Sequence, residues 1–261
     1  MAKPTIANVA ELAGVSQATV SRALRGATNV TEETRIKVQR AADQLNFTLS
    51  KSASALASGK TMRVILLVSG KLNEWFNSGV LQGVYEELAP VGYDVTPAFI
   101  TDRSELDRFF SQLPKSRNAD AIIISSFQLM PAMRDQLQAI DLPTVGVNVP
   151  AESGYFDASI SIDNSSAMTM AVRLLRSLGH TNIAFCSDYI PADMVYNTSQ
   201  RTQAFADAAQ ANATDGITFS LLTADAHDAP LSKSDLASQL TAKLLSLPER
   251  PTAVCLSLIH I

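Results

Sequence analysis

Four residues near the N-terminus share one face of a predicted short helix. If residues 17–24 are helical, Gln17, Ala18, Ser21 and Arg22 point outward together, while the apolar residues of the segment point inward. Glutamine and arginine side chains make paired hydrogen bonds to adenine and guanine edges in the major groove of DNA. The spacing therefore predicts a helix that reads DNA bases. A helical hairpin packed on another domain is the alternative interpretation.

The elements that would position this face are two short helices joined by a sharp turn. Apolar residues recur at helical spacing from Ile6 to Ala13. Gly14 then permits the positive φ that a sharp turn requires, and Ser16 is a good N-cap for the next helix. Two helices connected in this way, with a polar outer face on the second, form a helix-turn-helix.

A third helix is predicted in the stretch VTEETRIKVQRAADQLNF, residues 30–47. Thr31 would cap it, and Glu32 and Glu33 would lie at the positive end of its dipole. Its apolar residues have helical spacing, so the three helices together can close a small core.

Charge is distributed unevenly along the chain. Residues 1–60 contain eight Lys and Arg against four Asp and Glu, although the formal net charge of all 261 residues is -4. A basic N-terminal segment on an acidic remainder predicts that only the N-terminal part meets a polyanion.

The composition excludes several classes of protein. With 46% hydrophobic and 18% charged residues, the chain is that of an ordinary globular protein. No apolar run approaches the roughly 20 residues of a membrane helix, and the N-terminus lacks a signal core, so we expect a cytoplasmic, nucleoid-associated protein without membrane contact. Cys186 and Cys255 are expected to be free thiols. Because no Cys, His or carboxylate cluster has ligand spacing, neither a metal nor a cofactor is predicted.

Residues 48–61, TLSKSASALASGKT, are rich in Ser and Ala and have the composition of a linker. The SASALAS stretch within them has room for about two helical turns, which are too short to persist alone in water.

From residue 62 onward, apolar strand-like runs alternate with amphipathic helical segments. Strands are predicted at 63–69, 94–100, 120–126, 143–149, 158–163, 182–187, 217–223 and 252–258, and helices at 77–90, 103–113, 129–140, 164–178, 198–211 and 233–247. This alternation predicts parallel sheets with right-handed crossovers. The run at 158–163 is expected to cross between two similar lobes.

Polar and aromatic residues follow several of these predicted strands. In parallel sheets ligands bind beyond the carboxyl ends of the strands, and two facing lobes leave a cleft there. The residues expected in this cleft are Ser69, Asn73, Trp75, Phe76, Ser125, Asn148 and Arg201. Aromatic faces stack on sugar C–H surfaces, while amide and guanidinium groups bind hydroxyls. The set contains neither a phosphate-binding loop nor a nucleophile–base pair.

The stretches TIANVAELAGVSQATVSRAL, VTEETRIKVQRAADQLNF and ALASGKT resemble, in order and without gaps, the N-terminal module of the LacI/GalR family of bacterial transcriptional regulators. The resemblance implies a homodimer that binds a near-palindromic double-stranded DNA operator and changes its DNA affinity when a small molecule binds. The base-reading positions hold Gln17, Ala18 and Arg22. Positions that touch or border phosphate hold Thr5, Ser16, Thr19, Ser21, Asn29 and Thr34, for which helix capping or solvation is the alternative role.

In the linker, the resemblance implies a hinge helix that folds only on DNA, paired with its dimer mate in the minor groove. Leu56 matches the family's apolar wedge, which kinks the duplex, and Ala53 would keep the helix slim. The family often has an aromatic-x-Pro-Asn run before the hinge, whereas this chain has Leu49 and Ser50. We expect the loss of the proline to loosen the start of the hinge.

Residues 62–261 resemble the family's effector domain, which is itself similar to periplasmic sugar-binding proteins. Asn148 and Arg201 match common ligand-contacting positions. The prediction is thus an all-α helix-turn-helix domain (1–48), a hinge (49–61) and an α/β two-lobed effector domain (62–261) with lobes at about 62–157 and 158–261. The family continues beyond the last strand, so we expect a C-terminally truncated chain in which residues 256–261 do not belong to the natural continuation.

The expected function is that of a DNA-binding transcriptional regulator, and specifically a repressor, controlled by a small sugar or sugar derivative. A non-catalytic periplasmic-type sugar-binding protein is the first alternative, but the chain lacks a signal peptide and has the helix-turn-helix pattern. An α/β enzyme with a helical cap is the second alternative. No nucleophile motif, phosphate loop or carboxylate cluster supports it, so no enzymatic activity is predicted.

Overall fold

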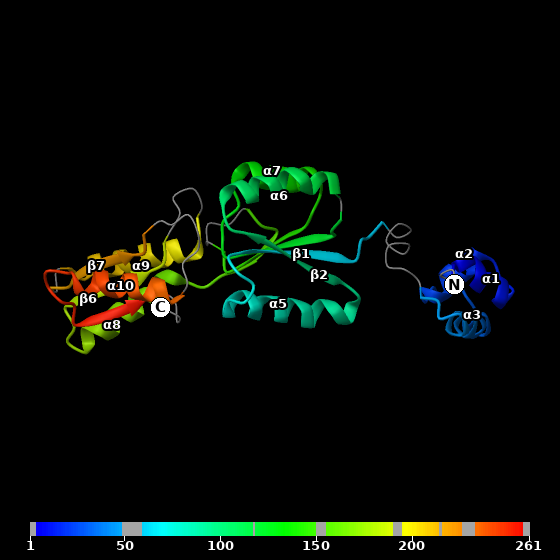
Figure 1. Cartoon of the computed structure of the whole chain (residues 1–261), viewed down its shortest axis with the longest axis horizontal. Coiled ribbons are helices and arrows are strands. Elements are labelled where there is room, and N and C mark those ends of the chain that lie inside the picture. Colours follow the sequence, from blue (N-terminus) through cyan, green and yellow to red (C-terminus); the bar gives the residue numbers. More distant parts are fainter. Residues whose placement is uncertain are drawn as a thin grey trace. The chain divides into compact units, whose positions relative to one another are not determined.

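The computed structural model describes residues 4–48, 59–116, 118–149, 155–189, 195–213, 216–225 and 233–257 (Figure 1). The chain divides into two compact units between Met62 and Arg63. The predicted hinge residues Ala53 and Leu56 lie outside the described residues. Within the described ranges, no helix combines the length and the apolar character that crossing a membrane requires.

The first unit is a bundle of three short helices, α1 (Ile6–Ala13), α2 (Gln17–Leu24) and α3 (Glu32–Gln44). Its core consists of buried valines and alanines, with Val9, Val20 and Val38 fully buried, one from each helix. Small side chains at the contacts let the helices approach closely while keeping the core dense. The predicted inner stripes of the three helices therefore form the core of this unit.

The turn between α1 and α2 passes through Gly14, whose φ is +67°. The backbone N–H of Val15 donates to the carbonyl of Ala10 at 3.1 Å, which closes the end of α1. Because a side chain at this left-handed position would be strained, glycine allows α2 to start only three residues later, after the N-cap Ser16. The turn predicted from the sequence is confirmed.

The second unit contains two parallel sheets. The first has five strands in the order β2-β1-β3-β4-β5, and all neighbouring pairs are parallel. These strands are β1 (Arg63–Ser69), β2 (Asp94–Ile100), β3 (Ala121–Ser125), β4 (Thr144–Val147) and β5 (Ala158–Ile160). Helix α5 (Trp75–Leu88), followed by the 3-10 turn η1 (Ala89–Val91), covers one face (Figure 1). Helices α6 (Arg103–Ser116) and α7 (Pro131–Ala139) cover the other face.

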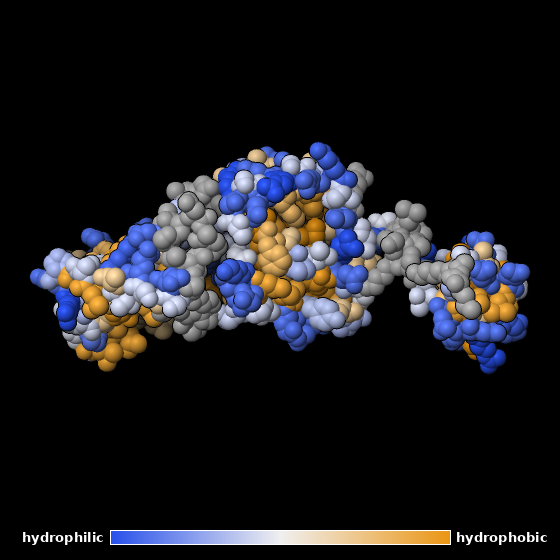
Figure 2. All heavy atoms as spheres, in the orientation of Figure 1, coloured by the Kyte–Doolittle hydropathy of each residue, from blue (hydrophilic) through white to orange (hydrophobic). Residues whose placement is uncertain are grey.

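The core of the first sheet lies between its strands and the α6–α7 layer. It contains Leu67 of β1, Ile124 of β3 and Phe110 of α6, all of them almost completely buried. Figure 2 shows the corresponding surface pattern, with hydrophilic residues over the outer helices and apolar residues in the band between the two helical layers. Burial of this apolar surface is the main stabilising contribution to the lobe.

The second sheet has three strands in the order β7-β6-β8, again all parallel. Its elements are β6 (Asn182–Ser187), β7 (Thr218–Thr223), β8 (Ala253–Leu256), α8 (Asn164–Ser177), α9 (Asn197–Ala211) and α10 (Lys233–Leu245). Phe185 of β6 stacks on Phe205 of α9 with 4.6 Å between ring centroids. Cys186 and Cys255 are free thiols, the first buried and the second half-buried.

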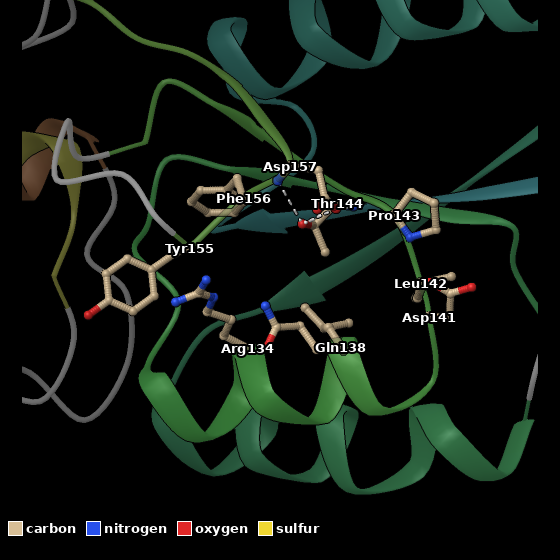
Figure 3. Close-up of a pocket in the computed structure, with 10 residues that line it drawn as sticks. Arg134, Gln138, Asp141, Leu142, Pro143, Thr144, Tyr155, Phe156 and Asp157 are labelled. Atoms are coloured by element: carbon tan, nitrogen blue, oxygen red, sulfur yellow. Dashed lines mark hydrogen bonds between the residues drawn. The ribbon is translucent and has the colours of Figure 1, made fainter.

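The strand at 158–160 belongs to the first sheet, whereas the sequence suggested that residue 158 begins a second lobe. Val145, Gly146 and Val147 of β4 pair in parallel with the three residues of β5. The carboxylate of Asp157 extends this pairing, because it accepts hydrogen bonds from the backbone N–H (2.7 Å) and the hydroxyl (2.9 Å) of Thr144 (Figure 3). The chain pairs along β4 before it crosses to the second sheet, so the second sheet begins at β6.

The Thr144 hydrogen bonds, from the backbone N–H first and the hydroxyl second, hold the pKa of Asp157 below its ordinary value. A carboxylate with a lowered pKa stabilises the folded state above its unfolded pKa of about 3.9, and this contribution is lost as the pH falls through the folded pKa. We expect Asp157→Asn to lower the urea midpoint at neutral pH. The difference in urea midpoint between this variant and the wild type should shrink as the pH falls below about 4.

The matched control is Asp135→Asn, which changes an exposed residue of α7. Its urea midpoint should follow the wild type at every pH. Circular dichroism across a pH series measures both variants. A midpoint gap for Asp157→Asn that stays constant down to about pH 3 would contradict the assigned role of the carboxylate.

Candidate functional site

The outward face of α2 carries the predicted base-reading residues. Gln17, Ala18 and Arg22 are exposed, whereas Ser21 is half-buried. The opposite face of α2 packs into the three-helix core through Val20 and other apolar residues of this helix. The helix is therefore held by its apolar side and presents an amide and a guanidinium group to solvent.

Several of the residues predicted to touch phosphate take part in helix caps. Thr5 and Asn8 form a capping box on α1, with the Thr5 N–H donating to Asn8 Oδ1 at 3.0 Å. Ser16 caps α2 by accepting from the backbone N–H of Thr19 at 3.1 Å. Thr34 lies in the first turn of α3, where its N–H donates to the Thr31 hydroxyl at 3.4 Å. The capping alternative thus applies to these residues, and phosphate contact stays a prediction.

Two further residues that were predicted to contact phosphate differ in their surroundings. The Thr19 hydroxyl lies 2.9 Å from the Ser16 hydroxyl, within the cap of α2. Asn29 is exposed in the connection between α2 and α3.

The basic side chains of the first unit fall into two groups. Arg35 pairs with Glu32 at 3.3 Å and also donates to the Ala27 carbonyl, so that it ties α3 to the connection after α2. Lys37 pairs with Glu33 at 2.8 Å. By contrast, three exposed arginines make no ion pair within the described part of the chain, namely Arg22, Arg25 and Arg40. These three arginines therefore carry positive charge that no ion pair within the described residues offsets.

In the second unit, the carboxyl ends of three neighbouring strands carry polar side chains in register. Val68 pairs with Ser125 and Ser125 with Val147, so the next residues, Ser69, Ser126 and Asn148, follow one another across the sheet. Ser126 and Asn148 both have left-handed backbone, with φ of +73° and +53°. Non-glycine residues adopt this conformation at a cost, and such residues cluster at functional sites.

Asn148 is the central polar residue of this edge. Its Nδ2 donates to the Ser126 hydroxyl at 3.4 Å. Its Oδ1 is buried and has no hydrogen-bond partner. The fully buried Ser125 hydroxyl also lies 3.4 Å from that of Ser126. An unpaired buried acceptor is costly unless a ligand or water satisfies it.

In the second lobe, Arg201 of α9 lies at the centre of a buried polar network. Its Nε donates to Asn164 Oδ1 at 3.1 Å, its Nη2 to Asn197 Oδ1 at 3.4 Å and its Nη1 to the Ser257 carbonyl. Asn164 Nδ2 donates to Asn197 Oδ1 at 2.9 Å. Burial lowers the pKa of Arg201. The arginine that was predicted to bind the ligand is thus already hydrogen-bonded to the first residues of α8 and α9 and to the residue after β8.

Two residues near this network were not predicted from the sequence. Asn197 Nδ2 and Ser199 Oγ are buried without a partner, as is the Ser257 hydroxyl. Asn197 and Ser199 belong to the first turn of α9, just before Arg201. Their signal in the sequence is weak, because polar residues in a helical first turn usually face solvent.

The two lobes meet where α9 begins. The Asn197 N–H donates to the Ser126 carbonyl at 3.1 Å, and the Gln128 N–H donates to the Val195 carbonyl at 2.8 Å. Phe127 and Tyr196 form an antiparallel bridge between these segments. The unpaired atoms of Asn148 and Asn197 therefore belong to residues on the two sides of one backbone junction, with Asn148 next to Ser126 in register.

The remaining predicted ligand residues lie at the junction of β1 and α5. Asn73 is exposed, and Trp75, the first residue of α5, is 50% exposed. Phe76 is half-buried and meets the Trp75 ring edge to face, with 5.7 Å between centroids. The Trp75 ring is thus half exposed at the start of α5, six residues after β1 ends at Ser69.

A hollow of about 420 Å³ lies elsewhere, between α7 and the segment 155–157 (Figure 3). The Arg134 guanidinium lies over the Tyr155 ring at its rim, 5.8 Å from the centroid. None of the predicted ligand residues lines this hollow. It includes Thr144, the first residue of β4, whereas Asn148 follows the end of that strand. The hollow and the polar edge are therefore at opposite ends of β4.

Residues 5–50 match the family described as bacterial regulatory proteins, lacI family. The chain is 32% identical over 187 residues to the HTH-type transcriptional repressor PurR of Vibrio cholerae serotype O1 (strain M66-2), covering 71% of this chain and 55% of that protein. It is 29% identical over 200 residues to the transcriptional regulator AglR of Rhizobium meliloti (strain 1021), covering 74% and 54%. The chain thus spans about half the length of these curated relatives.

Solved structures of transcriptional regulators share the fold. The lac repressor dimer bound to operator and the anti-inducer ONPF has a TM-score of 0.78 at 21% identity, covering 98% of this chain and 74% of that one. The complex of the transcriptional regulator CelR with cellobiose has a TM-score of 0.56 at 25% identity, with 97% and 73% covered. The predicted fold class, a helix-turn-helix segment followed by a parallel α/β effector-type domain, is confirmed. By these similarities the chain belongs to the LacI family of bacterial regulatory proteins, as its sequence motifs predict.

Proposed function

We propose that this chain is a sequence-specific regulator of transcription, a repressor, that binds a near-palindromic DNA operator as a homodimer. The observation that carries the proposal is the exposed face of α2, with Gln17 and Arg22 directed to solvent from a capped, core-anchored helix. These are the side chains that recognise adenine and guanine by paired hydrogen bonds. Ala18 offers a methyl group, which suits contact with the methyl of thymine.

The N-terminus of α2 supports a phosphate contact in the same complex. Ser16 fixes the start of the helix, where backbone N–H groups and the helix dipole favour an anion. We infer that Thr5, Ser16, Thr19, Ser21, Asn29 and Thr34 lie along the DNA backbone. Such contacts set the register of the protein on the duplex but carry no base information.

The linker between the two units completes the proposal. We retain a division into a DNA-binding domain (1–48), a hinge (49–61) and an effector domain (62–261). In the hinge, Leu56 would act as an apolar wedge in the minor groove, and Ala53 would allow close packing against the partner's hinge. Ordering of the hinge by DNA would couple the effector domain to the operator.

Replacement of Arg22 by alanine tests the DNA-reading face. A near-palindromic operator is first selected with the wild-type chain from a random double-stranded library at low salt. We expect Arg22→Ala to weaken binding to this operator by about 1–3 kcal/mol and to relax specificity at one base position of each half-site. Affinity is measured by fluorescence anisotropy over a salt series.

Arg40→Ala is the matched control, since it removes from α3 another exposed arginine that makes no ion pair within the described residues. It should leave the base preference unchanged. If both variants lose affinity equally on all sequences, Arg22 contributes charge only. If the wild type selects no sequence at all, the proposed function is wrong.

We further propose that a small sugar or sugar derivative binds at the junction of the two lobes. Asn148 Oδ1 needs a donor, while Asn197 Nδ2 needs an acceptor. A sugar hydroxyl is both donor and acceptor, so neighbouring hydroxyls of one ring can satisfy both amides. Trp75 would stack on the apolar face of the ring. The cellobiose bound by CelR supports this class of effector.

A thermal-shift screen against saccharides, with cellobiose and galactosides included, tests the effector class. For the best binder we expect Asn148→Gly to lower affinity by roughly tenfold or more, because one or two hydrogen bonds are lost. Glycine suits the left-handed backbone at this position, so the fold should be retained. Affinity is measured by isothermal titration.

Asp141→Gly provides a control with the same backbone change, because Asp141 also has a positive φ of +51° and lies in the loop before β4. Its sugar affinity should equal that of the wild type. Equal losses in both variants would mean that the effect comes from backbone flexibility, and the ligand role of Asn148 would be rejected.

A further inference from the structure

Asn77 is a polar side chain buried within α5, with only 3% of its surface exposed. Its Nδ2 donates two hydrogen bonds, to the carbonyl of Ser69 at 2.8 Å and to the carbonyl of Lys71 at 3.0 Å. Both acceptors precede the helix. The amide therefore connects the third residue of α5 to the last residue of β1 and to the loop that follows.

Backbone hydrogen bonds also hold the loop between β1 and α5, and the Glu74 N–H donates to the Lys71 carbonyl at 3.2 Å. The chain leaves β1 through Gly70 with a φ of +83°, and the Gly70 N–H donates to the Ile100 carbonyl at 3.2 Å. The N-cap residue of α5, Glu74, makes no side-chain capping hydrogen bond, and the first turn carries no acidic residue. Asn77 thus replaces a conventional cap as the side chain that fixes the start of the helix.

The helix itself is intrinsically weak. It contains Gly79 and Gly83, and each glycine in a helix interior costs about 1 kcal/mol relative to alanine. A helix of this kind depends on tertiary contacts for its position. Loss of the Asn77 amide would remove one donor from the Ser69 carbonyl and leave the Lys71 carbonyl with the Glu74 N–H, close to a helix that has little stability of its own.

Trp75 and Phe76 directly precede Asn77 and start the helix. We propose that Asn77 is a positioning residue, which fixes the β1–α5 loop and so holds the Trp75 ring at the strand-end edge. The proposal rests on the proposed effector site, where Trp75 stacks on the ligand. Asn77 does not contact the ligand in this proposal, since its donors are used by Ser69 and Lys71.

The single tryptophan of the chain makes the loop directly observable without any ligand. In the 261-residue chain, acrylamide quenching and the emission maximum of Trp75 report its exposure. We expect Asn77→Ala and Asn77→Asp to raise the quenching constant and to shift the emission. Alanine removes both donors, and aspartate keeps the shape but places an acceptor against two carbonyls. Asn77→Ser keeps one donor and should recover part of the wild-type value.

Gln82→Ala is the matched control, because Gln82 is an exposed amide on the same helix that bonds only to Glu86 within it. Its quenching constant should equal the wild-type value. Amide hydrogen exchange separates positioning from general structural support. In the Asn77 variants, protection should fall for residues 70–76 and persist in β1 at residues 64–68. Loss of protection throughout β1, or wild-type quenching in both Asn77→Ala and Asn77→Asp, would overturn the proposal.

A ligand experiment then connects the loop to the effector site. With the best saccharide of the thermal-shift screen, Asn77→Ala should bind roughly tenfold more weakly than Gln82→Ala. A tenfold change corresponds to about 1.4 kcal/mol, which is close to the net contribution of one hydrogen bond. If no saccharide binds the wild type, the proposed effector class fails, and the quenching and exchange results still decide the role of Asn77. If a saccharide binds Asn77→Ala as tightly as the control, the positioning role is rejected.

Discussion

The backbone junction between the end of β3 and the start of α9 is the constraint on which the rest of the second unit depends. The Ser126 carbonyl accepts from the Asn197 N–H at 3.1 Å, and Ser126 has left-handed backbone. Such a conformation costs of order 1 kcal/mol and persists only where neighbouring contacts fix it. Here the Ser126 N–H is held by the Val147 carbonyl, and the Asn148 N–H by the Ile160 carbonyl. Ordinary sheet hydrogen bonds thus maintain the conformation that lets the second lobe dock.

The polar network around Arg201 follows from the same junction. Asn197 contributes its N–H to the first lobe and its Oδ1 to Asn164 and Arg201. A ligand that binds the free Nδ2 of Asn197 would act on a residue that already joins α8, α9 and β3. In the proposed mechanism, effector binding therefore changes contacts between the lobes and not only contacts within one of them. Coupling of this kind needs two sites and one shared element with two arrangements.

Most elements could be predicted from the sequence because they are apolar runs with clear periodicity between turn residues. The strands at 63–69, 94–100 and 182–187 have the predicted bounds. The sheet that contains β5 could not be predicted, since all three residues of β5 are exposed and carry no pattern. Asn77 and Asn197 were missed for a related reason: an asparagine near a helix start resembles a solvated residue, and its burial arises only from tertiary packing.

In the first unit, folding itself limits which residues are free to recognise an operator. The core is made of valines and alanines, and so small a domain is only marginally stable. The side-chain caps of Thr5, Ser16 and Thr31, each contributing about 1 kcal/mol, are a sizeable share of that stability. Residue types at these positions are fixed by the helices they cap. Gln17 and Arg22 have neither a capping nor a core role, so the proposed operator preference can change at these positions without loss of the fold.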